Sequence, residues 1–266
     1  MPWALRGLRN GVLTTRWPRR PDPYADEFRG AVAVRSGSAV NGASEAERVA
    51  GVAADCPTGA ITVRDGPPRL DRGRCILCGR CVAAAPDTFD WAAGSDTAAL
   101  DRGALTVGAV PDTDDTLAEL RAALHRRVRR LRRSVHIRHV DTGSDGSDEW
   151  EIQALLNPVY DINRLGIFIT ASPRHADILL LTGVGAVGMT APLHRTRAAM
   201  PDPVVVIAAG ADAISGGLLG GGYISRGGAA DHLDVDVWVP GSPATPFALL
   251  HGILLALGRV PTTGAA

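Results

Sequence analysis

The chain has 266 residues, and its 28 basic and 28 acidic side chains give no formal net charge at pH 7. This length allows two domains with cores of their own, and the balanced charge excludes a general electrostatic attraction to nucleic acid. No apolar run reaches the ~18 residues that a membrane-spanning helix needs, and the opening MPWALRGLRN lacks the apolar stretch of a signal peptide. We therefore expect a cytoplasmic chain without a transmembrane segment of its own.

Residues 1–30 contain the stretch W-P-R-R-P-D-P and few periodic apolar positions, which predicts an extended N-terminal arm. Its first residues, W-A-L-R-G-L-R-N-G-V-L, are compatible with a short amphipathic helix that lies on a partner or on a bilayer surface. They are equally compatible with a disordered tail.

The four cysteines form an iron–sulfur pattern. Three of them lie in C75-I-L-C78-G-R-C81, and the fourth precedes a proline in C56-P-T-G. In bacterial ferredoxins a C-x2-C-x2-C run supplies three cluster ligands and a distant Cys-Pro supplies the fourth. Structural zinc prefers paired C-x2-C units, and disulfides are disfavoured in the cytoplasm. The spacing predicts one [4Fe–4S] cluster held by Cys56, Cys75, Cys78 and Cys81, in an α+β ferredoxin-like domain over residues 31–110.

The ligand positions of a second ferredoxin cluster carry no cysteine. The spacing of a two-cluster ferredoxin places these ligands at Ala46, Val49, Val52 and Ala85. Small apolar side chains at all four positions predict that core packing replaces this cluster, because an empty cavity is costly.

The rest of the chain predicts a linker helix and an α/β domain. In residues 111–133 acids crowd the start, arginines the end, and leucines recur at helical spacing, which is typical of an amphipathic helix. Over residues 134–260, apolar strand-like runs alternate with candidate helices at 149–157, 188–200 and 245–257. This alternation predicts a flavodoxin-like α/β domain with a mostly parallel sheet.

Ligand sites in such sheets lie beyond the carboxyl ends of the strands. Here these ends lead into three loops, at residues 141–148, 210–217 and 240–243. The sequence shows no nucleophile with a neighbouring base, and so predicts no catalytic site of the chain's own.

Several segments of the second half resemble one family. They are R138-H-V-D, L155-L-N-P-V-Y-D, S172-P-R-H-A-D-I-L-L-L-T-G, M200-P-D-P-V-V-V-I-A-A-G, A213-I-S-G-G and V239-P-G-S-P-A-T-P-F-A-L-L-H-G. Together they resemble the small subunit shared by respiratory complex I, the NADH–quinone oxidoreductase, and the membrane-bound group 4 [NiFe] hydrogenases, including formate hydrogenlyase. The first third, with G7-L-R-N-G-V-L-T-T-R-W-P, resembles the ferredoxin-type subunit of the same complexes. The chain therefore resembles a fusion of two electron-transfer subunits.

The resemblance also identifies a lost cluster site. The family's small subunit holds a [4Fe–4S] cluster through four cysteines, and the matching positions here are Asp145, Asp148, Asp212 and Ser242. Oxygen donors are hard ligands and iron–sulfur clusters take thiolates, so we expect no cluster there. One interpretation is that these residues bind a hard cation such as Mg²⁺ or Ca²⁺, or line a proton path. The other is a vestigial site, with the acids hydrated or paired with an arginine of a partner or with Arg174.

The resemblance implies an iron–sulfur electron-transfer subunit of a membrane-associated oxidoreductase complex. The implied partners are a large hydrogenase- or complex I-like catalytic subunit and antiporter-like membrane subunits, with no role for nucleic acid. Through these partners the chain would lie on the inner face of the cell membrane. The alternative is a redox-inactive scaffold subunit of a hydrogenase-related, ion-translocating complex, whose remaining cluster is structural.

Overall fold

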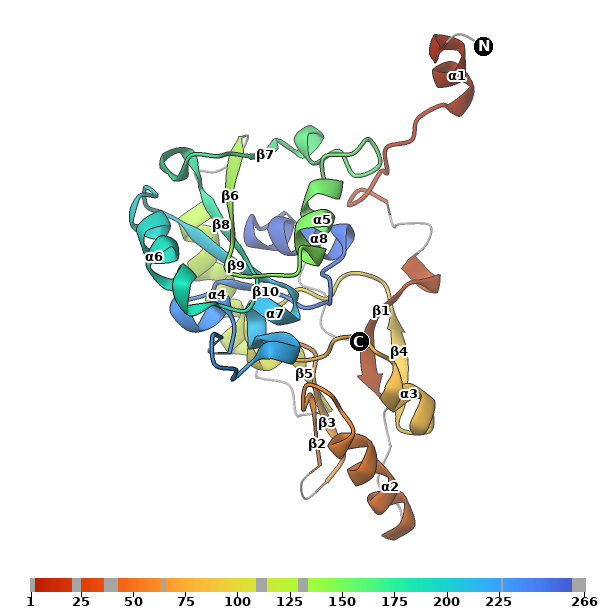
Figure 1. Ribbon diagram of the computed structural model, residues 1–266. Coiled ribbons are helices and arrows are strands. Elements are labelled where there is room, and N and C mark those ends of the chain that lie inside the picture. Colours follow the sequence, from red (N-terminus) through yellow and green to blue (C-terminus); the bar gives the residue numbers. More distant parts are fainter. Residues whose placement is uncertain are drawn as a thin grey trace.

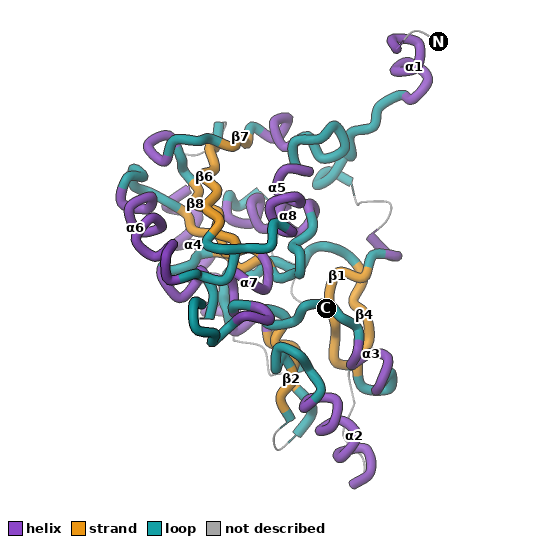
Figure 2. The backbone as a smooth tube through the Cα atoms, in the orientation of Figure 1, coloured by secondary structure: helices purple, strands orange, loops and turns teal. Residues whose placement is uncertain are grey.

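The computed structural model describes residues 3–20, 25–35, 43–63, 66–108, 114–128, 134–225 and 227–259. None of the helices in these ranges has the length and hydrophobicity needed to cross a bilayer. The described part contains a parallel sheet flanked by helices, two small antiparallel sheets, and an N-terminal arm that ends in an isolated helix (Figures 1 and 2).

The second half is built on a five-stranded parallel sheet. Its strands are β6 (Val135–Asp141), β7 (Ile167–Ile169), β8 (Ile178–Thr182), β9 (Val205–Ala209) and β10 (Val237–Val239). The spatial order is β10-β9-β8-β6-β7, and every neighbouring pair is parallel. Renumbered along the domain this is the order 2-1-3-4-5 of flavodoxin-like sheets. The predicted mostly parallel sheet is confirmed.

Both faces of this sheet are covered, which explains why its central strands are apolar throughout. Side chains of β8 alternate between two cores: Ile178 and Leu180 pack in one, Leu179 and Leu181 in the other. The first core includes α4 (Asp114–Val128), α5 (Ser147–Ala154) and α8 (Pro246–Ala256), and the second includes α6 (Thr190–Ala198) and α7 (Gly210–Ser215).

The first half contains two small antiparallel sheets. Strand β1 (Arg29–Val34) pairs with β4 (Phe89–Ala93), and β3 (Arg69–Asp71) lies between β2 (Ile61–Thr62) and β5 (Thr106–Val107). Helices α2 (Ala43–Ala54) and α3 (Arg80–Ala84) pack beside them. Short 3₁₀ helices complete the described chain: Ala25–Glu27, Gly103–Leu105, Ile162–Leu165, Pro173–His175, Val187–Met189, Gly217–Leu219 and Ala229–His232.

A two-cluster ferredoxin would carry the ligands of its second cluster at four positions that hold small apolar residues here. These residues lie in or near the core of this half. Val49 and Ala85 have no exposed surface, and Val52 packs against the same cluster of buried residues. Ala46 is partly exposed. The core that they help to form also contains Cys75 and Cys81.

The two halves meet along the outer edge of β10. Ala99 and Trp238 exchange two backbone hydrogen bonds, N–H to O, of 2.9 and 2.8 Å. The guanidinium of Arg102 donates two hydrogen bonds to Asp71, of 2.8 and 2.6 Å, and lies 5.9 Å from the centre of the Trp238 ring. These contacts join the three-stranded antiparallel sheet to the parallel sheet.

The N-terminal arm begins with helix α1 (Trp3–Asn10) and then runs onto the second half. The N–H of Thr15 donates to the carbonyl of Val159 at 2.9 Å. The indole of Trp17 is 9% exposed and packs edge-on against Phe247 in the first core. Residues Trp3–Asn10 are helical in the structure, and none of them is buried.

Candidate functional site

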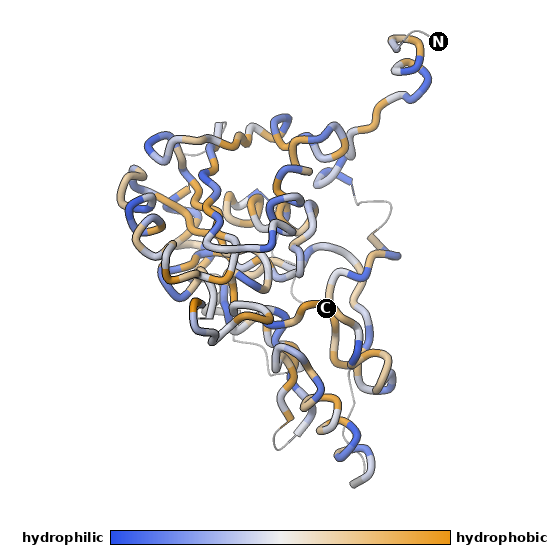
Figure 3. The backbone as a smooth tube through the Cα atoms, viewed as in Figure 1, coloured by the Kyte–Doolittle hydropathy of each residue, from blue (hydrophilic) through white to orange (hydrophobic). Residues whose placement is uncertain are grey.

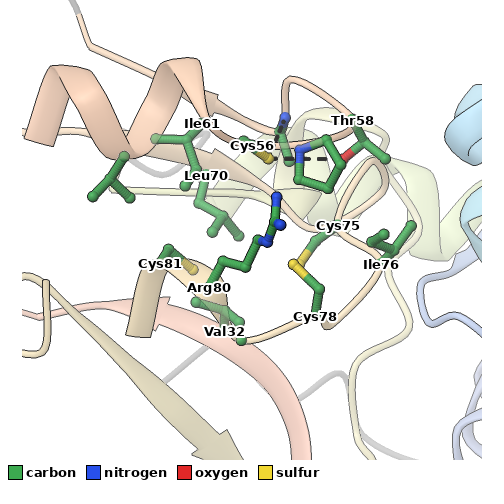
Figure 4. Close-up of a pocket in the computed structure, with 14 residues that line it drawn as sticks. Val32, Cys56, Thr58, Ile61, Leu70, Cys75, Ile76, Cys78, Arg80 and Cys81 are labelled. Atoms are coloured by element: carbon green, nitrogen blue, oxygen red, sulfur yellow. Dashed lines mark hydrogen bonds between the residues drawn. The ribbon is translucent and has the colours of Figure 1, made fainter. Parts of the chain in front are cut away.

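The structure places the four cysteines around one pocket of the first half (Figure 4). Cys56 follows α2, Cys75 and Cys78 lie in the loop after β3, and Cys81 lies in the first turn of α3. The rest of the lining is largely apolar and includes residues of β1, α2, β2 and β3. The lining residues besides the cysteines are Val32, Val52, Pro57, Thr58, Ala60, Ile61, Leu70, Ile76, Gly79 and Arg80.

The loop that carries three of the cysteines winds tightly at two positions. Leu77 has a φ of 54° and Gly79 a φ of 72°, both in the left-handed region. At Gly79 a Cβ atom would lie 2.9 Å from the indole of Trp91. A glycine is therefore needed here for both its backbone conformation and its lack of a side chain. The two turns let Cys75, Cys78 and Cys81 face the same pocket.

The electrostatics of the pocket disfavour free thiolates. Burial raises the pKa of Cys75 to about 11; the backbone N–H of Leu77 lowers it in part, and the thiolates of Cys81, Cys56 and Cys78 raise it further. Burial likewise raises the pKa of Cys81. The N–H of Ala60 donates to the sulfur of Cys56 at 3.3 Å. Thiols in such a pocket ionise only when a bound cation stabilises the thiolates, and the irons of a cluster would supply that positive charge.

This donor set fits an iron–sulfur cluster better than a single ion. Within the described ranges, no three His, Cys, Asp or Glu side chains are arranged as ligands of one metal ion. A [4Fe–4S] cluster spreads its four thiolates over different irons, so its ligands need not converge on one point. The soft sulfur donors, their number and their apolar surroundings therefore match the cluster chemistry predicted from the spacing.

The second candidate site lies at the carboxyl end of the parallel sheet. One contact and two hydrogen bonds bring the three loops together: the carboxylate of Asp148 lies against Gly210, Asp148 accepts from the N–H of Ala244 at 2.8 Å, and the N–H of Ala211 donates to the carbonyl of Gly241 at 2.7 Å. Asp145 is exposed and accepts hydrogen bonds from Ser147.

Asp148 is the buried member of this group, at 3% exposure. Burial raises its pKa to about 7; the Ala244 N–H opposes the shift, and the charges of Glu149, Asp212 and Asp145 add to it. A Cβ atom on Gly210 would lie 2.1 Å from the Asp148 carboxylate, so the two residues fit together only because Gly210 has no side chain. The expectation that the acids are hydrated is wrong for Asp148, because the loops after β9 and β10 cover it.

Asp212 and Ser242 complete the set. Asp212 is partly buried, which raises its pKa, and Asp145 and Glu149 raise it further. Ser242 is exposed. In the described ranges the carboxylates are not arranged around a single cation position, and no described contact pairs Arg174 with any of them. The hard cation therefore finds no support in the structure.

Sequence reasoning missed a polar network beside these acids. Glu149 accepts hydrogen bonds from the hydroxyls of Ser144 and Thr182, and His139 Nε2 lies 2.9 Å from the Thr182 hydroxyl. Burial lowers the pKa of His139, although Glu149 and Asp141 act in the opposite direction. The available signal was positional: His139 and Thr182 lie near the ends of β6 and β8, and these strands flank the switch point of a flavodoxin-like sheet.

Comparison with known proteins agrees with both halves of this description. Residues 69–124 match the model of a 4Fe-4S single cluster domain, and residues 146–256 match the model of the NADH ubiquinone oxidoreductase, 20 Kd subunit. The first match contains Cys75, Cys78 and Cys81 and begins after Cys56. A probable membrane-bound hydrogenase subunit, mbhJ, of Pyrococcus furiosus is 39% identical over 48% of this chain and 77% of its own length. The chain belongs to the family of the NADH ubiquinone oxidoreductase 20 kDa subunit, and the predicted resemblance is confirmed.

One further relative and one solved structure are similar to part of this chain. Formate hydrogenlyase subunit 7 of Escherichia coli is 41% identical over 56% of this chain, but the match spans only 58% of that subunit. Among solved structures, the membrane-bound sulfane sulfur reductase, described as an archaeal respiratory membrane complex, shares 28% identity over 50% of this chain and 74% of the matched chain, with a TM-score of 0.44.

Proposed function

We propose that the chain is an iron–sulfur electron-transfer subunit of a membrane-associated, hydrogenase-related complex, with one [4Fe–4S] cluster held by Cys56, Cys75, Cys78 and Cys81. The observation that carries the proposal is the meeting of these four thiols, from two separate segments, in one largely apolar pocket. When bound, a cluster of this kind supplies one-electron transfer. The chain's own residues hold the ligands, line the pocket with largely apolar side chains and donate a backbone N–H to the sulfur of Cys56.

The proposal also states that the cluster site of the small-subunit-like half has been lost. The positions that carry cysteine in the resembling family hold Asp145, Asp148, Asp212 and Ser242 here. Asp148 is engaged with Ala244 and packs on Gly210, so it serves as a contact between loops. We further propose that the domains follow the predicted division, with a ferredoxin-like unit over residues 31–110, the linker helix over 111–133 and the small-subunit-like unit over 134–260.

We propose a large catalytic-type subunit and antiporter-like membrane subunits as the partners. What supports partner subunits in general is that the relatives are named as subunits of a membrane-bound hydrogenase and of formate hydrogenlyase. These partners would hold the chain at the inner face of the membrane. The face formed by the three loops, with exposed Trp150 nearby on α5, is where we place the large subunit.

Iron content and reduction test the proposal together. The chain, purified anaerobically within its native complex, should contain about four irons and give one reducible EPR signal that responds to a physiological donor. About eight irons per chain would contradict the loss of the second site, and absence of iron would contradict the cluster.

A matched pair of variants assigns the ligands. Cys78→Ser, at an exposed cysteine in the pocket, should lower the iron content and remove the EPR signal. Ser242→Ala, at an exposed residue of the three-loop site, should change neither. Equal iron content in both variants would remove Cys78 from the ligand set.

One observation favours a second candidate function, a redox-inactive scaffold. The three loops contain no thiol in this chain. The cluster that the family's small subunit holds in these loops would therefore have no soft ligands here. If the iron never reduces with any donor, or reduces without effect on the complex, the scaffold is the correct function.

A further inference from the structure

The N-terminal arm carries large apolar side chains into solvent. Trp3 is 89% exposed, Leu8 81% and Val12 87%. Helix α1 extends away from the rest of the molecule, and hydrophobic and hydrophilic residues alternate along it (Figures 1 and 3). A group of exposed apolar side chains usually marks a site that binds another protein or a membrane.

The part of the arm nearest α1 carries only basic charged side chains. Residues 3–20 contain no Asp or Glu, and five arginines: Arg6, Arg9, Arg16, Arg19 and Arg20. On α1, Leu5 and Leu8 are three residues apart, as are Arg6 and Arg9, so each pair forms a stripe along the helix. Apolar and arginine stripes on one exposed helix are the pattern of segments that lie in the interface of an anionic bilayer.

The apolar surface continues from the arm onto the body. The Thr14 hydroxyl donates to the carbonyl of Pro158 at 2.7 Å, and Thr15 donates to Val159. Beside this contact, Leu156 is 50% exposed and Val159 is 40% exposed. The arm is thus fixed at its base, beside the two exposed side chains of the body.

A cavity at the base of the arm adds an independent observation. Three arginines and three apolar residues line it: Pro18, Arg19, Arg164, Leu165, Leu254 and Arg259. None of these lining residues is acidic.

Two of the guanidinium groups are fixed by backbone carbonyls. Arg164 donates to Trp17 at 2.6 Å, and Arg259 donates to Leu165 at 2.8 Å. Arginine has the planar donor geometry that matches phosphate. The apolar lining beside it suits the glycerol and upper acyl carbons of a lipid.

We propose that α1, the arm and the arginine cavity form one surface that binds the interface of an anionic phospholipid bilayer directly. The cavity receives the phosphate of a headgroup, Leu5 and Leu8 enter the boundary between headgroups and acyl chains, and Trp3, on a different side of α1 from the two leucines, lies at the headgroup level. This contact is additional to any attachment through partner subunits and does not depend on the iron content of the chain.

Flotation of the purified full-length chain with vesicles tests the proposal. We expect binding to vesicles of phosphatidylglycerol and phosphatidylcholine, weaker binding at high salt, and little binding to phosphatidylcholine alone. Inorganic phosphate at the concentration of the lipid should not displace the chain. Absence of binding to the anionic vesicles, as expected if a protein covers the arm, or equal binding to both vesicle types overturns the proposal.

Matched variants separate the arm from the cavity. Trp3→Ser combined with Leu8→Ser should weaken vesicle binding at least about tenfold. Arg19→Gln should weaken it about fivefold. The controls, Leu218→Ser and Arg195→Gln, change an exposed leucine and an exposed arginine elsewhere and should bind like the wild type. The proposal fails if either test variant binds like the wild type or if the controls lose as much binding. Far-UV circular dichroism checks that each variant is folded.

Discussion

At the scale of single residues, Asp148 shows how one buried acid can connect loops that are distant in sequence. Its carboxylate accepts a backbone hydrogen bond from the loop after β10 and packs on the first residue of α7. A buried hydrogen bond adds little net free energy to folding. Removal of its acceptor is costly, however, because the buried donor is then left unpaired. Asp148 therefore links three loops of different origin.

Removal of this carboxylate should destabilise the second half. At about pH 5.5, Asp148→Ala leaves the Ala244 N–H without its acceptor, and we expect a loss of about 1–3 kcal/mol in the free energy of unfolding. Asp148→Asn keeps a side-chain oxygen at this position and should lose less than about 1 kcal/mol. Urea unfolding followed by circular dichroism measures both. Equal losses would show that the hydrogen bond is not the source of the effect.

The pKa of Asp148 predicts a pH dependence with a definite sign. Its pKa is about 7 in the folded chain, because of burial, and near its ordinary 3.8 when unfolded. The folded state binds the proton more tightly, so stability falls as pH rises between these values. From about pH 5 to pH 7 the free energy of unfolding should fall by roughly 2 kcal/mol. Urea unfolding of the wild type should show this decline, and Asp148→Asn should show a smaller one. Identical slopes would contradict the assignment.

Residue types and spacing predicted the cysteine pocket, because ligand geometry restricts where cysteines can stand. The burial of Asp148 could not be predicted in the same way. Its exposure depends on how loops at Gly210 and Ala244, distant in sequence, close over it. The network of Glu149 with His139 and Thr182 was equally hidden, since none of its members forms a motif along the chain.

At the scale of elements, the apolar runs predicted the mostly parallel sheet, because both faces of the sheet are buried and its strands are therefore apolar throughout. Helix α7 was not predicted, since it has only six residues and begins at a glycine. The leucine stripe of the linker helix was only partly informative: Leu124 and Val128 are buried, but Leu120 is 38% exposed.

Trp17 anchors the arm to the body, and its loss should release the arm. Trp17→Ala removes a nearly buried indole and its contact with Phe247, a change that costs about 3–5 kcal/mol in a core. We expect trypsin to cleave after Arg16 or Arg19 at least about tenfold faster. Mass spectrometry of the fragments measures this. Trp3→Ala, at an 89% exposed indole, is the control and should leave the rate unchanged.

At the scale of the whole molecule, the chain combines a cysteine pocket with a sheet that ends in a site without thiols. Length and composition predicted two units but not their contact. That contact depends on Ala99, Arg102 and Trp238, which show no pairing signal in the sequence.

Restoring thiols tests whether the three loops still have the arrangement of a cluster site. A variant that combines Asp145→Cys, Asp148→Cys, Asp212→Cys and Ser242→Cys should increase the iron content from about four to about eight per chain after anaerobic reconstitution. The same variant with Ser242 retained should gain less iron. No gain in a folded quadruple variant would mean that the loops have diverged too far to hold a cluster.

The hydrogen bonds between Ala99 and Trp238 also protect the molecule from self-association. Strand β10 lies at an edge of the parallel sheet, and its outer side is occupied by residues of the first half. A fragment that begins after the linker helix would leave this edge open, with the N–H and carbonyl of Trp238 available to other chains. Unpaired strand edges of this kind template aggregation, so the second half should stay soluble only while the first half remains attached to it.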